Sequence, residues 1–200
     1  MDGRNYAADG LTRTGSGDKP GILAMTHADS NTLAATWGFP QLNGSPQHPV
    51  VDTNIPDPDT FVDQYIAARD YYYPSGTYSG LTWGSSSSPV VVDCVTPNSE
   101  ESVRFTGNVE GWGILIVRGN LTIDQNFKFH GLVIVYGDDY SITVTSGGNA
   151  QIIGALLFQG GSNSLFNATG ASYFKYSSDA LNKAKYIGKL LAYQVISWYE

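Results

Sequence analysis

Five polar side chains in the second half of the chain are of the types that could cleave a glycosidic bond. Polysaccharide hydrolases and lyases need carboxylates and a base that converge on one face. His130 directly precedes Gly131, whereas the Asp138–Asp139 pair directly follows Gly137. These positions flank one short apolar strand, too far apart for joint acid–base work, so we interpret the aspartate pair as a solvated turn. We therefore predict no catalytic residue among the candidates, which are Asp124, Lys128, His130, Asp138 and Asp139.

Metal-binding residue types are spaced unfavourably for a metal or cofactor site. The three histidines, His27, His48 and His130, are far apart in sequence, and neither an Asp-x-Asp-x-Asp-Gly loop nor a His-Glu-x-x-His motif occurs. Cys94 stands among valines, which favours a small buried hydrophobe over a reactive thiol. We predict neither a metal nor a cofactor.

Aromatic side chains cluster around a segment rich in glycine and serine, residues 74–88, which we interpret as a flexible loop. Exposed aromatic rings in such a loop can stack on a sugar ring or anchor a protein partner. The alternative is that some of the tyrosines only cover the side of the core. The candidate binding residues are Tyr71, Tyr72, Tyr73, Tyr78 and Trp83.

A repeated seven-residue frame, in which two glycines enclose five mostly apolar residues, predicts the scaffold that holds these side chains. It occupies Gly113–Gly119, Gly131–Gly137 and Gly154–Gly160, with starts 18 and then 23 residues apart. Short aliphatic strands that recur at this length are typical of a parallel β-helix, in which each turn buries its strand on the next. The frames align Ile116, Ile134 and Leu157, which we predict to form one inward ladder.

The predicted fold is mostly β: a short right-handed single-stranded parallel β-helix with two peripheral α-helices and an irregular N-terminal segment. One helix is expected over residues 59–72, and a second after Ser177, a residue type favoured at the N-cap. A final strand is expected over residues 191–198. Residues 1–102 would form an extended segment with one helix that packs on the solenoid, and residues 103–200 the β-helix core with its capping helix and strand.

The charge of the chain excludes two classes of partner. The formal net charge is −7 and no run of Lys or Arg occurs, which argues against nucleic acid and against an anionic membrane surface. No apolar run reaches the length needed to cross a bilayer, and residues 1–5 are too polar to begin a signal peptide.

Residues 105–200 resemble the C-terminal region of PilX-type proteins, which are minor-pilin-like proteins of bacterial type IV pilus assembly. Lys19–Ile22 and Gly38–Pro40 fit the family more loosely. The segments that carry the resemblance are Gly111–Ile123, Phe127–Gly137, Asn149–Leu157, Phe174–Leu181 and Ser197–Glu200.

The resemblance implies a non-enzymatic structural or adhesive ectodomain outside the cell, at the cell surface. Its partners would be other pilus or surface proteins and surface glycans. Family members begin with a leader and a long apolar helix, so we expect an anchoring segment that is missing before residue 1. Two alternatives are a carbohydrate-active lyase or hydrolase on the same scaffold, and a solenoid that assembles end to end.

Overall fold

Parallel strands and two helices make up the described part of the protein, which confirms the prediction of a mostly β fold. The computed structural model describes residues 1–20, 22–24, 43–46, 49–137, 143–146, 148–161, 164–168 and 171–187. The strand predicted over residues 191–198 lies outside the described residues. The elements before the main sheets are β1 (Leu23–Ala24), β2 (Val50–Val51), the 3-10 turn η2 (Pro58–Thr60) and the helix α2 (Val62–Ala67).

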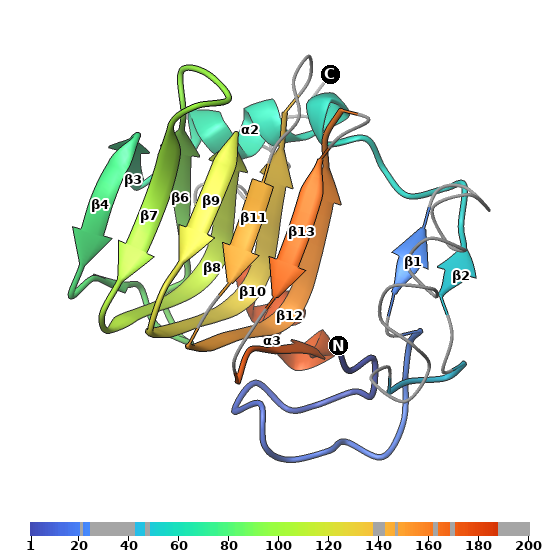
Figure 1. The fold of residues 1–200 in the computed structure, drawn as a ribbon. Coiled ribbons are helices and arrows are strands. Elements are labelled where there is room, and N and C mark those ends of the chain that lie inside the picture. The colour runs from blue at the N-terminus through green and yellow to red at the C-terminus, as the bar shows by residue number, and fades with distance from the viewer. Residues whose placement is uncertain are drawn as a thin grey trace, which may run out of the picture.

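Strands from Tyr71 onwards form two parallel sheets that face each other (Figure 1). The seven-stranded sheet has the order β14-β12-β10-β8-β6-β3, with β5 paired to β8, and the five-stranded sheet has the order β13-β11-β9-β7-β4. In Figure 1 the arrows of one sheet point opposite to those of the other. The strands of the first sheet are β3 (Tyr71–Pro74), β5 (Thr82–Trp83), β6 (Val90–Val95), β8 (Val109–Arg118), β10 (Asn126–Tyr136), β12 (Asn149–Gln159) and β14 (Tyr173–Tyr176). Those of the second are β4 (Gly76–Ser79), β7 (Ser102–Thr106), β9 (Asn120–Ile123), β11 (Thr143–Ser146) and β13 (Leu165–Ala168).

Strands on both sides of the predicted boundary at residue 102 pair with each other. β4 pairs with β7, and β6 pairs with β8. The named strands of the two sheets therefore begin at Tyr71, before the predicted boundary.

The register of the three glycine frames agrees with the predicted alignment. Ile134 of β10 lies opposite both Ile116 of β8 and Leu157 of β12. The predicted direction of this ladder was wrong. Ile116 and Ile134 belong to a cluster with Val62 of α2, on the helix-covered face of the sheet.

The core between the sheets is formed by the alternate residues of the same strands. Leu115 and Val133 are fully buried there against Phe105 and Leu121 of the opposing sheet. Successive side chains of a strand point to opposite faces. The inner ladder, with Leu115 and Val133, therefore lies one residue along each strand from the ladder that the helices cover, with Ile116 and Ile134.

Helix positions follow local capping chemistry. The carboxylate of Asp57 accepts a hydrogen bond from the Asp59 backbone N–H at 3.1 Å and so caps the start of η2. The helix α2 follows and ends at Ala67. The predicted helix over 59–72 was too long, because Tyr71–Pro74 joins the sheet as β3. The Ser177 hydroxyl accepts from the Ala180 N–H at 3.1 Å, which confirms the predicted N-cap of α3 (Ser178–Lys185).

Three glycines, Gly113, Gly131 and Gly154, stack in register where the long strands β8, β10 and β12 turn. Their φ angles are 129°, 130° and 143°, a region that side chains disfavour. A Cβ on Gly131 would lie 2.0 Å from the carbonyl oxygen of Gly113, and a Cβ on Gly154 would lie 1.9 Å from that of Gly131. The backbone itself fills the space at this bend, so only glycine fits.

Replacing Gly131 with Ala should lower the free energy of unfolding by at least about 3 kcal/mol, because the methyl group must displace a backbone carbonyl as well as strain φ. The matched control is Gly80→Ala, since Gly80 also has a positive φ of 64° but has nothing within 4 Å of the added Cβ. We expect that control to cost about 1 kcal/mol. Urea denaturation of both variants measures the difference, and equal losses would contradict the packing argument.

Candidate functional site

The five candidate aromatic residues lie on strands, not in a flexible loop. Tyr71, Tyr72 and Tyr73 belong to β3, Tyr78 belongs to β4, and Trp83 belongs to β5. Aromatic residues favour strands, whereas Gly76 begins β4 and Gly80 lies in the turn between β4 and β5. The prediction of a loop over residues 74–88 was therefore wrong, because short strands run through this segment.

Three of the five candidates fill the end of the space between the sheets, and we call Tyr73, Tyr78 and Trp83 the aromatic plug. The rings of Tyr73 and Tyr78 meet edge to face at 4.8 Å, and Trp83 packs on Phe105 at 5.3 Å. The indole N–H of Trp83 donates to the Tyr73 hydroxyl at 3.0 Å, and the Tyr78 hydroxyl donates to the Pro74 carbonyl at 2.8 Å. Trp83 is only 1% exposed. The plug therefore packs as core.

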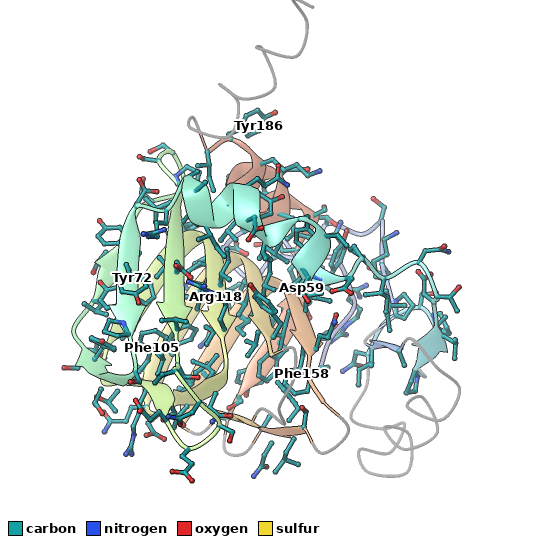
Figure 2. All side chains as sticks on the ribbon, turned by 90° about the horizontal axis from the view of Figure 1, so that it is seen from above. Asp59, Tyr72, Phe105, Arg118, Phe158 and Tyr186 are labelled. Atoms are coloured by element: carbon teal, nitrogen blue, oxygen red, sulfur yellow. The ribbon has the colours of Figure 1, made fainter. Side chains whose placement is uncertain are left out.

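The other two candidates, Tyr71 and Tyr72, are exposed by 39% and 51%. They are consecutive residues of one strand, so their side chains point to opposite faces. Arg69 lies over the ring of Tyr72 at 5.5 Å, an arrangement that cation–π attraction favours. Figure 2 shows Tyr72 on the side of the molecule where β3 ends the sheet, and Phe105 among the strands.

Both sheets end at β3 and β4, whose outer sides we call the β3–β4 edge. β3 pairs only with β6 and β4 only with β7 among the strands of the described residues. Neither Tyr71–Pro74 nor Gly76–Ser79 contains a charged residue. An edge strand presents unpaired backbone groups, and natural edges are often protected by charge, by proline or by a cover. Among the described residues, Pro74 is the only one of these protections at the β3–β4 edge.

An ion pair with a buried carboxylate and a partly exposed guanidinium lies beside Tyr72, and the sequence analysis missed it. Asp93 lies opposite Tyr72 in the register of β3 and β6. Its side chain is fully buried, and the guanidinium of Arg118 donates to it at 2.8, 3.1 and 3.2 Å. An aspartate in the valine-rich strand β6 is the signal that could have revealed the pair, because a buried carboxylate needs a partner. The pair holds β6 to β8.

The residues considered for acid–base chemistry do not converge in the described residues. Asp124 accepts from Arg104 at 2.7 Å on the second sheet, whereas Lys128 lies 4.0 Å from Glu110 on the first. Asp138 and Asp139, like His27 and His48, lie outside the described residues. In the part of the chain that the structure describes, no group of three His, Cys, Asp or Glu residues is placed to hold a metal ion. Cys94 is buried, and burial raises the pKa of its thiol.

His130 is instead a buried contact between β10 and the N-terminal segment. Its ring stacks on Trp112 at 3.9 Å, and its Nδ1 lies 2.6 Å from the carbonyl oxygen of Ala8. A carbonyl can only accept, so the neutral ring carries its proton on Nδ1. The other nitrogen, Nε2, has no hydrogen-bond partner, although Glu110 Oε1 lies 3.7 Å away. Burial, followed by repulsion from the Lys128 ammonium, lowers the pKa of His130 to about 4.

Comparison with known proteins adds no assignment to this geometry. No protein-family model, curated protein or solved structure matches the chain. Among the described residues, no helix is long and apolar enough to cross a membrane. The function must therefore be argued from the residues and their placement.

The free energy of unfolding should decrease when the pH is lowered, because of His130. An unfolded histidine has a pKa near 6.5 and the folded one has a pKa of about 4, so between these values only the unfolded chain takes up this proton. The stabilisation is complete above pH 6.5 and declines, by up to about 3 kcal/mol, as the pH falls to 4. His130→Phe keeps a ring on Trp112 but cannot titrate. Urea denaturation at several pH values should show that this variant loses less stability over the window, and parallel curves for the two proteins would contradict the assignment.

The aromatic plug and the exposed tyrosines should respond differently to truncation. Trp83→Ala removes a fully buried ring and should cost about 3–5 kcal/mol of unfolding free energy. Tyr72→Ala removes a half-exposed ring and should cost less than about 1 kcal/mol. Thermal and chemical denaturation of both variants measure this difference. If both were tolerated equally, the end of the core would be more loosely packed than its contacts indicate.

Proposed function

We propose that the two sheets are faces of a right-handed single-stranded parallel β-helix. The chain passes from β6 to β7, then to β8, β9, β10 and β11, and so alternates between the two sheets. Right-handed crossovers are strongly preferred between parallel strands. The stacked glycines support the proposal, because each repeat places its bend directly on the bend of the one before.

A column of asparagines supports the same fold. Asn126 Nδ2 donates to Asn108 Oδ1 at 3.0 Å, and Asn149 Nδ2 donates to Asn126 Oδ1 at 3.2 Å. Equivalent positions of successive repeats thus carry the same side chain with the same hydrogen bond. A stacked solenoid repeats its contacts from one neighbour to the next in this way.

We infer that the protein is a non-enzymatic structural module of the bacterial cell surface, an ectodomain associated with type IV pili. The observation that carries this proposal is how the ionisable side chains in and beside the two sheets are used. Asp93 pairs with Arg118, Asp124 pairs with Arg104, and His130 binds the Ala8 carbonyl. These side chains hold strands and segments together, whereas no described strand pairs with the β3–β4 edge, which is therefore available to a partner. The pilus context rests on the resemblance of residues 105–200 to PilX-type proteins.

The exposed tyrosines favour a protein partner over a surface glycan. A sugar-binding platform needs aromatic rings that one saccharide can contact together. Tyr71 and Tyr72 point to opposite faces of β3 and cannot share one sugar ring. They do flank an unpaired strand edge, where a partner strand gains both backbone hydrogen bonds and aromatic contacts.

Replacing Tyr71 and Tyr72 with Ala should weaken attachment of the domain to isolated type IV pili by about tenfold or more, because tyrosines commonly supply much of the binding energy of an interface. Surface plasmon resonance with pili as the immobilised probe measures the effect. The matched control is Tyr186→Ala, since Tyr186 is also an exposed tyrosine, by 70%, but lies at the end of α3.

The same preparations should release no product from pectin, alginate or peptidoglycan. Product release that disappears in Asp124→Ala or His130→Ala would favour the lyase or hydrolase alternative. Unchanged attachment of the double tyrosine variant would exclude the β3–β4 edge as the contact surface.

A further inference from the structure

The two ends of the seven-stranded sheet differ in how they are finished. At one end, β14 is paired on its outer side by the chain's own N-terminus. The Asp2 N–H donates to the Phe174 carbonyl at 2.7 Å, and the Tyr176 N–H donates to the Asp2 carbonyl at 2.8 Å. Asn43 then pairs with Asp2 in a further parallel bridge. The other end is β3, which belongs to the β3–β4 edge and which no further described strand covers.

The N-terminal cover is fastened by side chains as well as by backbone pairing. Asn5 exchanges three hydrogen bonds with Ser178 of α3, at 2.9, 3.0 and 3.1 Å. The Ala8 N–H donates to the carboxylate of Asp179 at 3.0 Å, and Lys175 donates to the Gly10 carbonyl at 2.7 Å. Another chain could not pair with β14 unless this segment left it.

We propose that the partner at the β3–β4 edge is a second copy of this chain, joined head to head about a two-fold axis. This inference rests on the proposed function, since it uses the same edge, and a second copy and a pilus subunit would compete for that edge. A two-fold axis would set β3 against β3 and β4 against β4 of the second copy, each pair antiparallel. The two sheets would then run continuously through both molecules.

A second copy fits this edge better than a single extended segment does. Two strands that run in opposite directions end there together, one from each sheet (Figure 1). One extended segment could pair with only one of them, whereas a second copy presents both. Because β3 and β4 contain no charged residue, the symmetric contact brings no like charges together within the strands, despite the net charge of −7.

The assembly should close at two copies. A contact between unlike surfaces can propagate into a filament, but an isologous two-fold contact uses the same surface on both partners and is then complete. The far end of the first sheet is already paired by Asp2, so head-to-tail addition on that sheet is blocked. This distinguishes the proposed dimer from an end-to-end polymer.

The test is sedimentation velocity of the full chain over about a hundredfold range of concentration, together with amide hydrogen exchange of residues 71–79. We expect a monomer–dimer equilibrium, with slower exchange of these amides at high concentration. Tyr72→Lys combined with Thr77→Lys places charges on both edge strands and should weaken dimerisation by about tenfold or more. The matched control is Leu11→Lys with Tyr186→Lys, which adds the same charge at exposed sites away from the edge and should leave the dimer unchanged.

Three outcomes would overturn the dimer: a monomer at every concentration, oligomers that keep growing, or a dimer that survives the Tyr72→Lys/Thr77→Lys change in a folded protein. Circular dichroism and melting of each variant establish that it is folded. The proposed function fails separately, since pilus attachment is measured independently. Because a second copy and a pilus subunit would occupy the same edge, attachment is measured at concentrations where the chain is monomeric. A chain that attaches there but never dimerises would overturn the dimer alone, and a chain that dimerises but does not attach there would overturn the pilus role alone.

Discussion

Close approach of one backbone to the next at the stacked glycines is the constraint on which the rest of the structure depends. At Gly113, Gly131 and Gly154 the bend of each strand lies against the carbonyl of the strand beside it. This contact sets the register of β8, β10 and β12. The register in turn aligns the remaining stacks of side chains, which are the inner aliphatic residues, the ladder beneath the helices and the asparagines. Side-chain packing could accommodate small shifts between strands. Repacking of side chains could not make room for a Cβ at these glycines, because the atoms in the way belong to the backbone.

The sequence predicted this register because glycine spacing is a local property of the chain. It could not predict which face of the sheet the helices cover, since β8 and β10 are apolar on both faces. The inner Leu115 and the outer Ile116 are alike in sequence, and only the position of α2 distinguishes them. The length of α2 was overestimated for a related reason. The helical spacing of the apolar residues before the tyrosines extended the predicted helix to residue 72, but pairing with β6 makes Tyr71–Pro74 a strand.

The parts of the candidate site that escaped prediction depend on residues far apart in sequence. His130 meets the Ala8 carbonyl across 122 positions, and Asp93 meets Arg118 across 25. Neither pair forms a motif, because each partner is recruited by the strand stack and not by local spacing. Trp83 was expected to be exposed since its neighbours are glycine and serine. It belongs to the short strand β5, which pairs with β8 and directs the indole ring into the core. The composition of a segment therefore does not predict whether one particular side chain in it is buried.

The N-terminal cover over β14 has a consequence for the order in which the protein folds. The contacts between successive strands span roughly one repeat, but those between Asn5 and Ser178 span 173 residues. Closing so long a loop costs more entropy than closing a short one, so pairing within the stack can precede it. We expect the cover to form last during folding and to open first in native-state hydrogen exchange. In a chain emerging from a ribosome, Asp2 and Asn5 would therefore remain unpaired until β14 and α3 had been made.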